Sequence, residues 1–386
     1  MKRLLLCALS AVAASSWAQF RVPVAVAGHR DPAKPRQTID EFKTASDLIR
    51  ATMRKEPIVN VRVIVVQRLY YDSSVFQQVK VEMSKDGKVR QTVLAPLSQQ
   101  GTELVDDGQT LRIYTPDDKR LIEQPSDQQG DGEISFRMNL VDQNYTLRIS
   151  RKVKIAGRDA LVVEAVPRHE SLETRCYSID DKTGLLLRLE TCKEGRSPML
   201  HLDTKAVEFP ATFSEDTFKL DPAFSRTESF HDRCVSPKSA GELTVELGFQ
   251  PAVPAKLPYG FEAQELQAST DSPARALIVR VTDGLEKATV LEWRKEGRSA
   301  SDPPAGTLVQ NSGGLTLLIS GDLPDDVKRR LLQVFAAVAQ GERLELIPYR
   351  GGSWGQELVC SVNVFPVDRE AGGNGPATAI PVIVRI

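Results

Sequence analysis

Apolar and polar residues alternate with a period of two along much of the chain, which is the pattern of β-strands that bury one face. The stretch Ile58–Tyr71 is long and rich in β-branched residues. Residues 75–84 and 88–97 flank an Asp-Gly pair, which is a strong signal for a hairpin turn. Residues 177–190 show apolar stretches on both sides of a polar turn. The pattern predicts consecutive antiparallel strands joined by short turns, for which an up-and-down curved sheet is the simplest topology.

Two segments show helical spacing instead. Thr38 and Glu41 have the spacing of a capping box at the start of a helix expected over residues 38–54. The apolar face of this helix would consist of Ile39, Phe42, Ala45, Ile49 and Met53. A second helix is predicted to begin at Pro324, because the missing N–H of proline costs little there. Its predicted buried face consists of Val327, Leu331, Val334, Phe335 and Val338. The polar residues 125–133, by contrast, predict a loop.

The first residues have the pattern of a secretory signal peptide. Lys2 and Arg3 precede an apolar run from Leu4 to Ala14, and the small-x-small sequence Ser16-Trp17-Ala18 predicts cleavage after Ala18. The apolar run is shorter than the roughly 20 residues that a membrane span needs. We expect an exported protein, periplasmic or otherwise outside the cytoplasm, in preference to a buried N-terminal helix.

The mature chain of about 370 residues is long enough for two domains. Residues 19–37 are rich in proline and alanine and predict an extended lead-in. The first domain is expected over residues 38–222. Residues 223–241 lose the alternating pattern and predict a linker. The second domain is expected over residues 242–386, with a tail from about residue 341 that shows less pattern.

The charge balance argues against nucleic acid as the main ligand. The chain has 50 basic and 51 acidic residues, so that removal of Lys2 and Arg3 with the signal peptide leaves 48 against 51, a net charge near −3. No basic field is present to attract a phosphate backbone. We therefore expect no nucleic-acid partner.

Four cysteines remain after removal of the signal peptide, namely Cys176, Cys192, Cys234 and Cys360. An oxidising compartment permits disulfides, and four cysteines allow three complete pairings. A hairpin in residues 177–190 would place Cys176 opposite residues 188–190, so that direct cross-strand pairing with Cys192 would need a bulge. All four cysteines are disulfide candidates and the connectivity stays open. No C-x-x-C spacing indicates a thioredoxin-like or zinc site.

The remaining polar residues do not form a recognisable catalytic, metal or cofactor motif. The four histidines are His29, His169, His201 and His231, and none belongs to an H-E-x-x-H motif. The sequence has no G-x-S-x-G elbow and no phosphate-binding P-loop. His231 and Cys234 could in principle activate a thiolate, but their place in a linker of an exported protein favours a disulfide for the cysteine. The Asp-Asp pairs fall at turns or at a helix start, where aspartate caps backbone N–H groups. We expect a protein that is not an enzyme and that needs no cofactor.

An apolar surface is the candidate binding site. A curved sheet beneath a helix can enclose a cavity for acyl chains, since each buried CH₂ gains about 0.8 kcal/mol. The candidates to line such a lipid cavity are Phe42, Ile49 and Met53 of the early helix together with Val59, Val61, Val63 and Val65 of the first strand. The plainer interpretation, and the favoured one, is that the same valines form the ordinary core beneath that helix. Both interpretations stay open from the sequence.

Several motifs occur in an order and spacing that carry a family resemblance over roughly residues 55–340. The motifs are YTPDDKRL at 114–121, NYTLRI at 144–149, IAGRDALVVEAVPR at 155–168, YSIDDKTGLLLRLE at 177–190, LPYGF at 257–261, TDGLEKATVLEW at 282–293 and GDLPDDVKRRL at 321–331. In this order they resemble the RseB/MucB family of exported regulators of envelope-stress sigma factors. The chain departs from the family pattern at Ser178, where an aromatic residue is usual, and in continuing to Ile386.

The resemblance implies a fold and a function. The fold is mainly antiparallel α+β: an N-terminal domain similar to the lipoprotein carriers LolA and LolB, with a curved half-barrel sheet covered by helix, and a smaller C-terminal α+β domain. Family members bind the exported part of a membrane-spanning anti-sigma factor, shield it from proteolysis and release it in response to lipid-like ligands.

Our leading hypothesis is therefore an exported, non-catalytic regulator whose partner is a membrane-anchored anti-sigma factor and whose N-terminal domain senses lipid. The alternative is a periplasmic lipid or lipoprotein carrier of LolA/LolB type, which would use the same sheet for acyl chains. An envelope enzyme is a third class, which the missing catalytic motifs disfavour.

Overall fold

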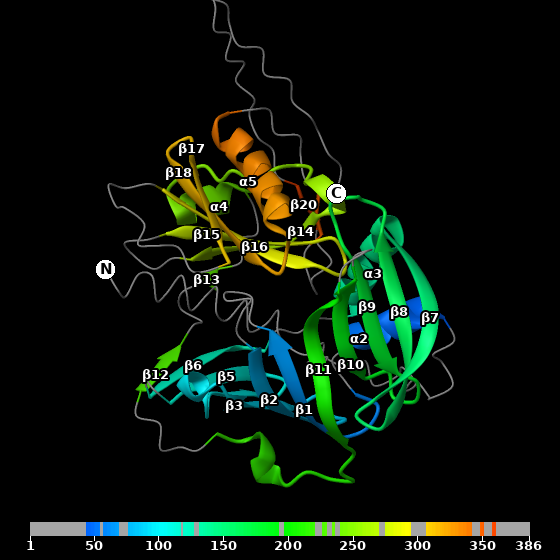
Figure 1. Cartoon of the computed structure of the whole chain (residues 1–386). Helices are drawn as coiled ribbons and strands as arrows, with labels where there is room; N and C mark the ends of the chain where they lie inside the picture. The colour runs from blue at the N-terminus through cyan, green and yellow to red at the C-terminus, as the bar shows by residue number, and fades with distance from the viewer. Residues whose placement is uncertain are drawn as a thin grey trace, which may run out of the picture. The chain divides into compact units, whose positions relative to one another are not determined.

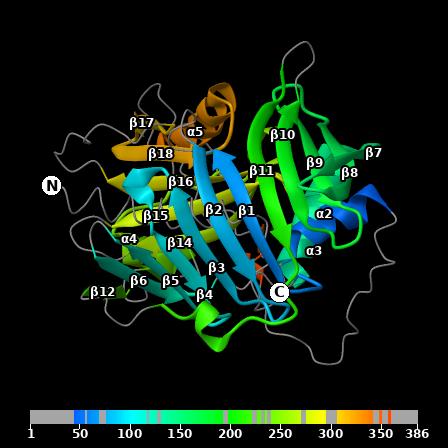
Figure 2. The same ribbon diagram turned by 60° about the horizontal axis from the view of Figure 1, so that its bottom comes forward.

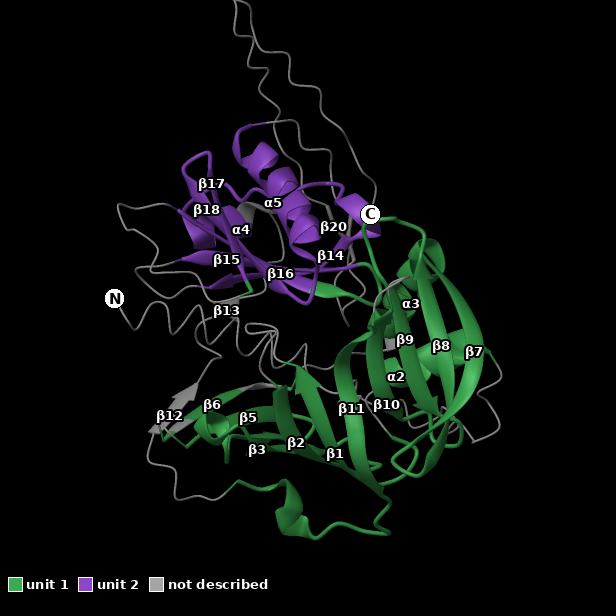
Figure 3. Cartoon of the chain, in the orientation of Figure 1, with its two compact units in different colours: residues 1–232, 283–287, 304–306 green, residues 233–282, 288–303, 307–386 purple. Residues whose placement is uncertain are grey.

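The computed structural model of the chain (Figures 1 and 2) describes most of the residues between the predicted lead-in and the tail. The described residues are 44–54, 57–68, 76–116, 119–126, 131–192, 197–220, 226–229, 234–235, 240–269, 275–294, 306–341, 348–350 and 357–359. They divide into two compact units (Figure 3). Unit 1 comprises residues 1–232, 283–287 and 304–306, and unit 2 comprises residues 233–282, 288–303 and 307–386.

Unit 1 is built on one large sheet. Among the described residues, twelve strands are ordered β12-β6-β5-β4-β3-β2-β1-β11-β10-β9-β8-β7. Their bounds are β1 Val61–Arg68, β2 Phe76–Met83, β3 Val89–Ala95, β4 Glu103–Asp106, β5 Thr110–Thr115, β6 Arg120–Pro125, β7 Tyr145–Ile155, β8 Arg158–Pro167, β9 Thr174–Asp180, β10 Leu186–Cys192, β11 Met199–Glu208 and β12 Arg226–Ser229. The runs β1–β6 and β7–β11 are each up-and-down, as predicted, and they meet where β11 pairs with β1. Strand β12 pairs in parallel with β6.

The sheet bends strongly and stays open, as Figure 2 shows. Several register shifts lie near the junction of the two runs of strands. One shift lies in β1 against β11, between Ile64 and Val65, and another lies in β10 against β11, between Leu189 and Glu190. Such bulges bend the strand that carries them and increase its local twist. They therefore contribute to the curvature that separates β1–β6 from β7–β10.

Helix α2 (Ala45–Met53) is the early helix, but it begins later than the sequence suggested. Thr44 is its N-cap: the Asp47 N–H donates to Thr44 Oγ1 at 3.1 Å and the Thr44 N–H donates to Asp47 Oδ2 at 3.0 Å. This reciprocal pair is a complete capping box, so Thr38 is not the cap of α2. The predicted box at Thr38 and Glu41 lies outside the described residues.

Helix α3 (Asp131–Asn144) corrects the prediction of a loop over residues 125–133, because it starts inside that segment. Its sequence ISFRMNL alternates like a strand and conceals the helical repeat. In the folded chain Ile134, Met138 and Val141 are buried, which is the i, i+4, i+7 spacing of one helix face. Helices α2 and α3 pack on each other and on β7, so both cover the sheet at its β7–β9 end.

Unit 2 is a smaller α+β unit. The described strands of its main sheet are ordered β13-β14-β15-β16-β18-β17. Their bounds are β13 Cys234–Val235, β14 Glu262–Ser269, β15 Ala276–Thr282, β16 Lys287–Arg294, β17 Leu308–Ser312 and β18 Leu315–Gly321, and a separate pair is formed by β19 Pro348–Arg350 and β20 Glu357–Val359. Helix α4 (Ala240–Leu247) was not predicted, and it begins within the expected linker, which also contains β12 and β13.

Helix α5 (Asp325–Ala339) begins where predicted, with Pro324 at its N-cap position, and packs on β17 and β18. Val327, Leu331 and Phe335 are fully buried at 0% exposure. Val334 and Val338, also predicted for the buried face, are only half-buried. None of the helices in the described part of the chain combines the length and the apolar character needed to cross a membrane.

Candidate functional site

The structure places the predicted cavity residues in two separate apolar clusters. Ile49 and Met53 of α2 lie in the first, which we call the helix cluster. Its buried members are Leu48, Ile49, Met53, Ile134, Met138, Val141, Tyr145, Val163, Ala165, Tyr177, Ile179 and Leu186. They come from α2, α3 and strands β7–β10, so the early helix packs on the second run of strands.

Val61, Val63 and Val65 lie in the second, which we call the valine cluster. Its buried members are Val61, Val63, Val65, Val79, Val81, Met83, Val89 and Leu202. The valines of β1 and the apolar residues of the early helix therefore belong to different clusters. The valines are buried, but they do not form the core directly beneath that helix. Leu189 packs against both clusters. Val59 is half-buried ahead of β1, and Phe42 lies outside the described residues.

Polar side chains that belong to no sequence motif continue the valine face. Gln67 follows Val61, Val63 and Val65 at the same period of two, and it lies opposite Gln77 of β2. Gln67 Nε2 donates to Gln77 Oε1 at 2.9 Å. Both side chains are buried, at 2% and 1% exposure. The buried face of β1 and β2 therefore changes from valine to amide along the strands.

Three buried polar atoms on this face have no hydrogen-bond partner among the described residues: Gln67 Oε1, Gln91 Nε2 and Thr204 Oγ1. Gln91 lies on β3 opposite Val81, and Thr204 lies on β11 opposite Val65. A buried polar atom without a partner is uncommon in a folded protein and calls for an explanation such as a bound water or ligand. The valine face therefore offers one acceptor, one donor and one hydroxyl beside a broad apolar surface.

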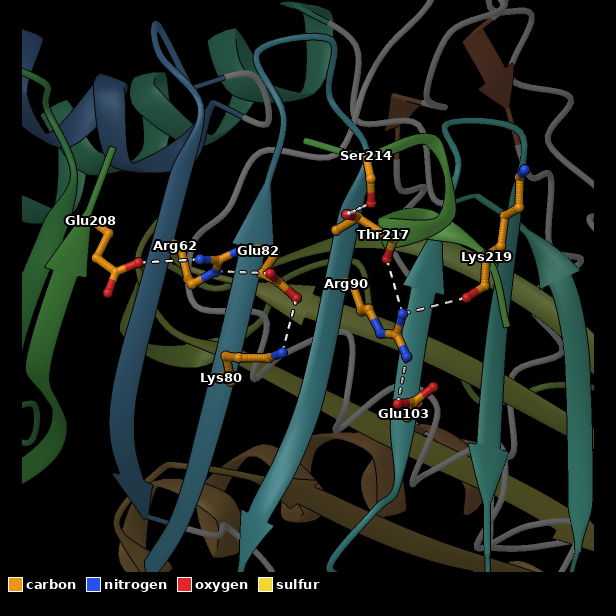
Figure 4. Close-up of polar contacts among 9 residues, drawn as sticks. All are labelled: Arg62, Lys80, Glu82, Arg90, Glu103, Glu208, Ser214, Thr217 and Lys219. Atoms are coloured by element: carbon orange, nitrogen blue, oxygen red, sulfur yellow. Dashed lines mark hydrogen bonds and ion pairs between the residues drawn. The ribbon is translucent and has the colours of Figure 1, made fainter. Parts of the chain in front are cut away.

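The opposite face of the same strands carries paired charges (Figure 4). Arg62 Nε donates to Glu82 Oε1 at 2.8 Å and its NH1 lies 3.2 Å from Glu208 Oε2, so one guanidinium joins β2, β1 and β11. Lys80 Nζ lies 3.2 Å from the other oxygen of Glu82, whose side chain is only 5% exposed. The hydrogen bond to Glu82 is the main reason why the pKa of Arg62 is raised. This face is thus a cross-strand ladder of compensated charges.

The segment that follows β11 is fixed to this charged face. The short 3-10 helix η3 (Glu215–Phe218) lies beside β3, where Arg90 NH1 donates to the carbonyl oxygens of Thr217 at 3.1 Å and Lys219 at 3.4 Å. Arg90 NH2 donates to Glu103 Oε1 at 2.7 Å. Phe213 stacks edge-on against Phe218, and the Arg62 guanidinium lies 5.8 Å from the Phe213 ring centroid. These contacts indicate a structural role for the charged face, although Arg90 Nε is also buried without a hydrogen-bond partner among the described residues.

His201, Cys176 and Cys192 lie on strands β9–β11. His201 Nε2 is buried 2.7 Å from Arg175 NH1 and 2.5 Å from Thr191 Oγ1, within a polar contact that joins three neighbouring strands. Cys176 and Cys192 form a disulfide between β9 and β10. Cys176 lies opposite Glu190, so the bond runs diagonally across the pair with a Cα–Cα distance of 6.5 Å. Cys360 and the side chain of Cys234 lie outside the described residues.

Two of the acidic pairs that the structure describes serve turns, whereas Asp325 and Asp326 lie in the first turn of α5. Asp107 Oδ1 accepts from the backbone N–H groups of Gln109 and Thr110. Burial acts to raise the pKa of Asp107, but these hydrogen bonds and that of Arg112 outweigh it, so the pKa is lowered. Asp180 caps its turn in the same way through the Thr183 N–H at 2.8 Å. Within the described ranges, no group of three or more His, Cys, Asp or Glu side chains is arranged to hold a metal ion.

Comparisons with known proteins agree with this architecture. A crystal structure of MucB superposes with a TM-score of 0.50 at 18% identity, covering 75% of this chain and 96% of that chain. The complex structure of Pseudomonas aeruginosa MucA/MucB gives a TM-score of 0.51 at 19% identity, covering 74% and 96%. At this identity the likeness concerns the fold, and it confirms the predicted mainly antiparallel α+β class with a curved sheet and a smaller second unit. No curated protein matches the sequence. Residues 66–219, however, match the family model of the MucB/RseB N-terminal domain, and this match confirms the predicted resemblance to the RseB/MucB family.

Proposed function

We propose that the protein is an exported, non-catalytic regulator that binds the exported part of a membrane-anchored anti-sigma factor. The observation that carries this proposal is the MucB/RseB N-terminal domain at residues 66–219. A protein of similar fold, MucB, has been solved in complex with MucA, which supports a protein partner for this fold. The signal-peptide pattern of residues 1–18 supports export. The ion pairs of the charged face and the turn roles of Asp107 and Asp180 support binding without catalysis.

A pull-down tests this proposal. The chain from residue 19 onward is immobilised and offered the purified exported segment of a candidate anti-sigma protein at micromolar concentration and low salt. We expect retention of the segment, with retention lost when an unrelated exported protein replaces either component. A failure of several candidate segments to bind under these conditions would contradict the proposal.

We further propose that the valine face accepts an acyl chain, so that lipid regulates the partner. The support is the apolar surface of β1–β3 beside the three buried polar atoms without partners, which suit the polar end of an amphipathic ligand. Organic extraction of the purified protein followed by mass spectrometry should detect acyl lipid. The substitution Gln91→Leu should reduce the amount recovered, whereas Thr92→Val on the opposite face of β3 serves as the matched control. Bound lipid without any anti-sigma partner would instead favour the carrier function.

A further inference from the structure

Strand β7 forms one edge of the large sheet and is unusual in its length and charge. In the described structure β8 is its one strand neighbour, and Figure 1 shows β7 at the end of the sheet. It is 11 residues long, and most of its residues are exposed. An exposed edge presents a row of backbone N–H and C=O groups that can pair with another extended chain. Natural edges are usually short, so an edge of this length needs an explanation.

The charge of β7 is of one sign. Arg148, Arg151, Lys152 and Lys154 are its charged residues, and it contains no aspartate or glutamate, although the whole chain is slightly acidic. Glu164 of β8 serves both arginines, with Arg148 NH2 at 2.6 Å and Arg151 NH1 at 3.7 Å. Lys154 has a loose contact of 3.7 Å with an exposed aspartate of β8. Among the described residues, two neighbouring carboxylates thus face four cations, which leaves a surplus of positive charge along this part of the edge.

The cations lie on both faces of the sheet. Arg148 and Arg151 pair with Glu164 and Val162 of β8, which are two residues apart and share one face. Lys152 and Lys154 pair with residues 161 and 159, which share the other face. A flat membrane surface could approach only one of these faces. A strand added at the edge, in contrast, places its own side chains alternately on both faces beside all four cations.

We propose that β7 is a docking edge for an extended, acidic segment of a partner protein, which adds to the sheet as a further strand. Backbone hydrogen bonds would supply the pairing, and glutamate or aspartate side chains would lie beside the four cations. A second copy of β7 is a poor occupant, because it would bring arginine and lysine against arginine and lysine. Exposed Ile149 (42%) adds an apolar contact between the charged positions. The proposal is independent of the anti-sigma partner, which could bind through another surface.

The test uses a fluorescein-labelled peptide of about ten residues, the length that spans β7, made of glutamate, threonine and valine with glutamates on both faces. Fluorescence anisotropy at low salt with the chain from residue 19 onward should show binding, and hydrogen exchange should slow within residues 146–154. The double variant R151Q/K152Q should bind roughly twofold to thirtyfold more weakly. The variant K85Q/K88Q, which neutralises two exposed lysines of the β2–β3 turn, is the matched control and should bind like the parent.

Two further peptides decide between strand addition and simple charge attraction. A peptide of the same sequence with alternate backbone amides methylated keeps the charge but loses the donors on one edge, and we expect it not to bind. A peptide in which lysine replaces every glutamate should also fail to bind. Equal binding of the methylated peptide, or of the parent peptide to R151Q/K152Q, would overturn the proposal. If phosphatidylglycerol vesicles slowed hydrogen exchange in β7 and the acidic peptide did not, the proposal would be overturned in favour of a membrane surface as the partner.

Discussion

The carboxyl group of Glu292 gives unit 2 a pH-dependent stability that can be worked out from its surroundings. Glu292 lies on β16 and is 0% exposed. The Ala252 N–H donates to both carboxylate oxygens, at 2.8 and 3.1 Å. Burial raises the pKa of Glu292 to about 8, although the hydrogen bond from Ala252 acts in the opposite direction. The side chain is therefore protonated in the folded protein at neutral pH.

The sign and size of the effect follow from proton linkage. In the unfolded chain a glutamate has a pKa of about 4.3. Between this value and about 8 the folded state keeps a proton that the unfolded state has released, so unfolding becomes easier as the pH rises. The loss is about 1.4 kcal/mol for each pH unit, or on the order of 5 kcal/mol across the window. This is comparable with the total stability of many domains, about 5–15 kcal/mol.

The substitution Glu292→Gln removes this titration, because the amide is neutral at every pH and its oxygen can still accept from the Ala252 N–H. We expect the unfolding free energies of the variant and the parent to differ by only about 1 kcal/mol near pH 5. Near pH 8.5 the variant should be more stable by several kcal/mol, up to about 5. The matched control is E262Q, which makes the same substitution at an exposed position of β14.

Urea unfolding between pH 5 and 8.5 measures the difference. The experiment uses the chain from residue 19 onward with Trp354→Phe, in which Trp293 is the remaining tryptophan. Trp293 adjoins Glu292 on β16, so its fluorescence reports the unfolding of unit 2. If the parent and E292Q gave parallel curves over this range, the carboxyl group would not be retaining a proton, and the reasoning from burial would be refuted.

Three further predictions concern unit 1. Arg158→Ala should lower the unfolding free energy measured in urea by about 3 kcal/mol, because it removes a bidentate partner, at 2.7 and 3.0 Å, of the fully buried Asp180. Burial opposes ionisation of Asp180, but the hydrogen bonds from Arg158 and Thr183 leave its pKa lowered. The stabilisation is therefore present above about pH 4 and is lost as the pH falls through the pKa of Asp180 in the folded protein. A parent protein that lost no more stability in acid than R158A would contradict this prediction. If the valine cluster is solid core, Val65→Ala should lower the unfolding free energy by about 2 kcal/mol in the same assay, and Val65→Phe should lower it by about 1–3 kcal/mol. If the cluster is instead a cavity for acyl chains, the protein should tolerate Val65→Phe, and less lipid should be extracted from this variant. The double variant C176S/C192S should lose about 3 kcal/mol of unfolding free energy, because the disulfide closes a loop between cysteines 16 residues apart. Equal melting temperatures of the parent and this variant in the absence of reductant would contradict this prediction.

Local hairpins were predictable because their signals are local. The Asp-Gly pair between residues 75–84 and 88–97 marks a turn, and the structure pairs Met83 with Val89 across it. The turn in residues 177–190 likewise sets the register of β9 and β10, which places Cys176 opposite Glu190. In both cases the chain returns immediately, so the alternation of each strand fixes which face is buried.

The junction of the sheet was not predictable in the same way. Strand β11 pairs with β1 through contacts such as Val63 with Val207, residues separated by most of unit 1. No local pattern in the sequence indicates which of the many β-branched strands pair with each other over such a distance. Helix α3 was missed for another reason, since its apolar residues alternate like a strand until the fold selects Ile134, Met138 and Val141 as the inner face.

The candidate site shows the same division between local and distant information. The valine face of β1 was evident from its period of two, and Gln67 lies at the next position of that period. A wider reading of the alternation, with polar residues included, would have singled out Gln67. Gln91 and Thr204 come from β3 and β11, however, and they share its face only through the register of strands far apart in sequence. The polar part of the site is therefore a product of the tertiary fold.

The two faces of β1 together limit how a ligand could enter the valine cluster. A shift of β1 by one residue would move Arg62 into that cluster and expose the valines, so the apolar face strongly specifies the register. The charged face specifies it again, because Arg62 reaches both Glu82 and Glu208 only when β1 is aligned with β2 and β11 as observed. Sliding of the strands is therefore disfavoured from both sides of the sheet. If the valine cluster binds an acyl chain as proposed, room for that chain would have to come from rotation of side chains such as Leu189, which packs against both clusters. Val65→Phe therefore separates a solid core from a ligand cavity more sharply than a substitution that only removes atoms.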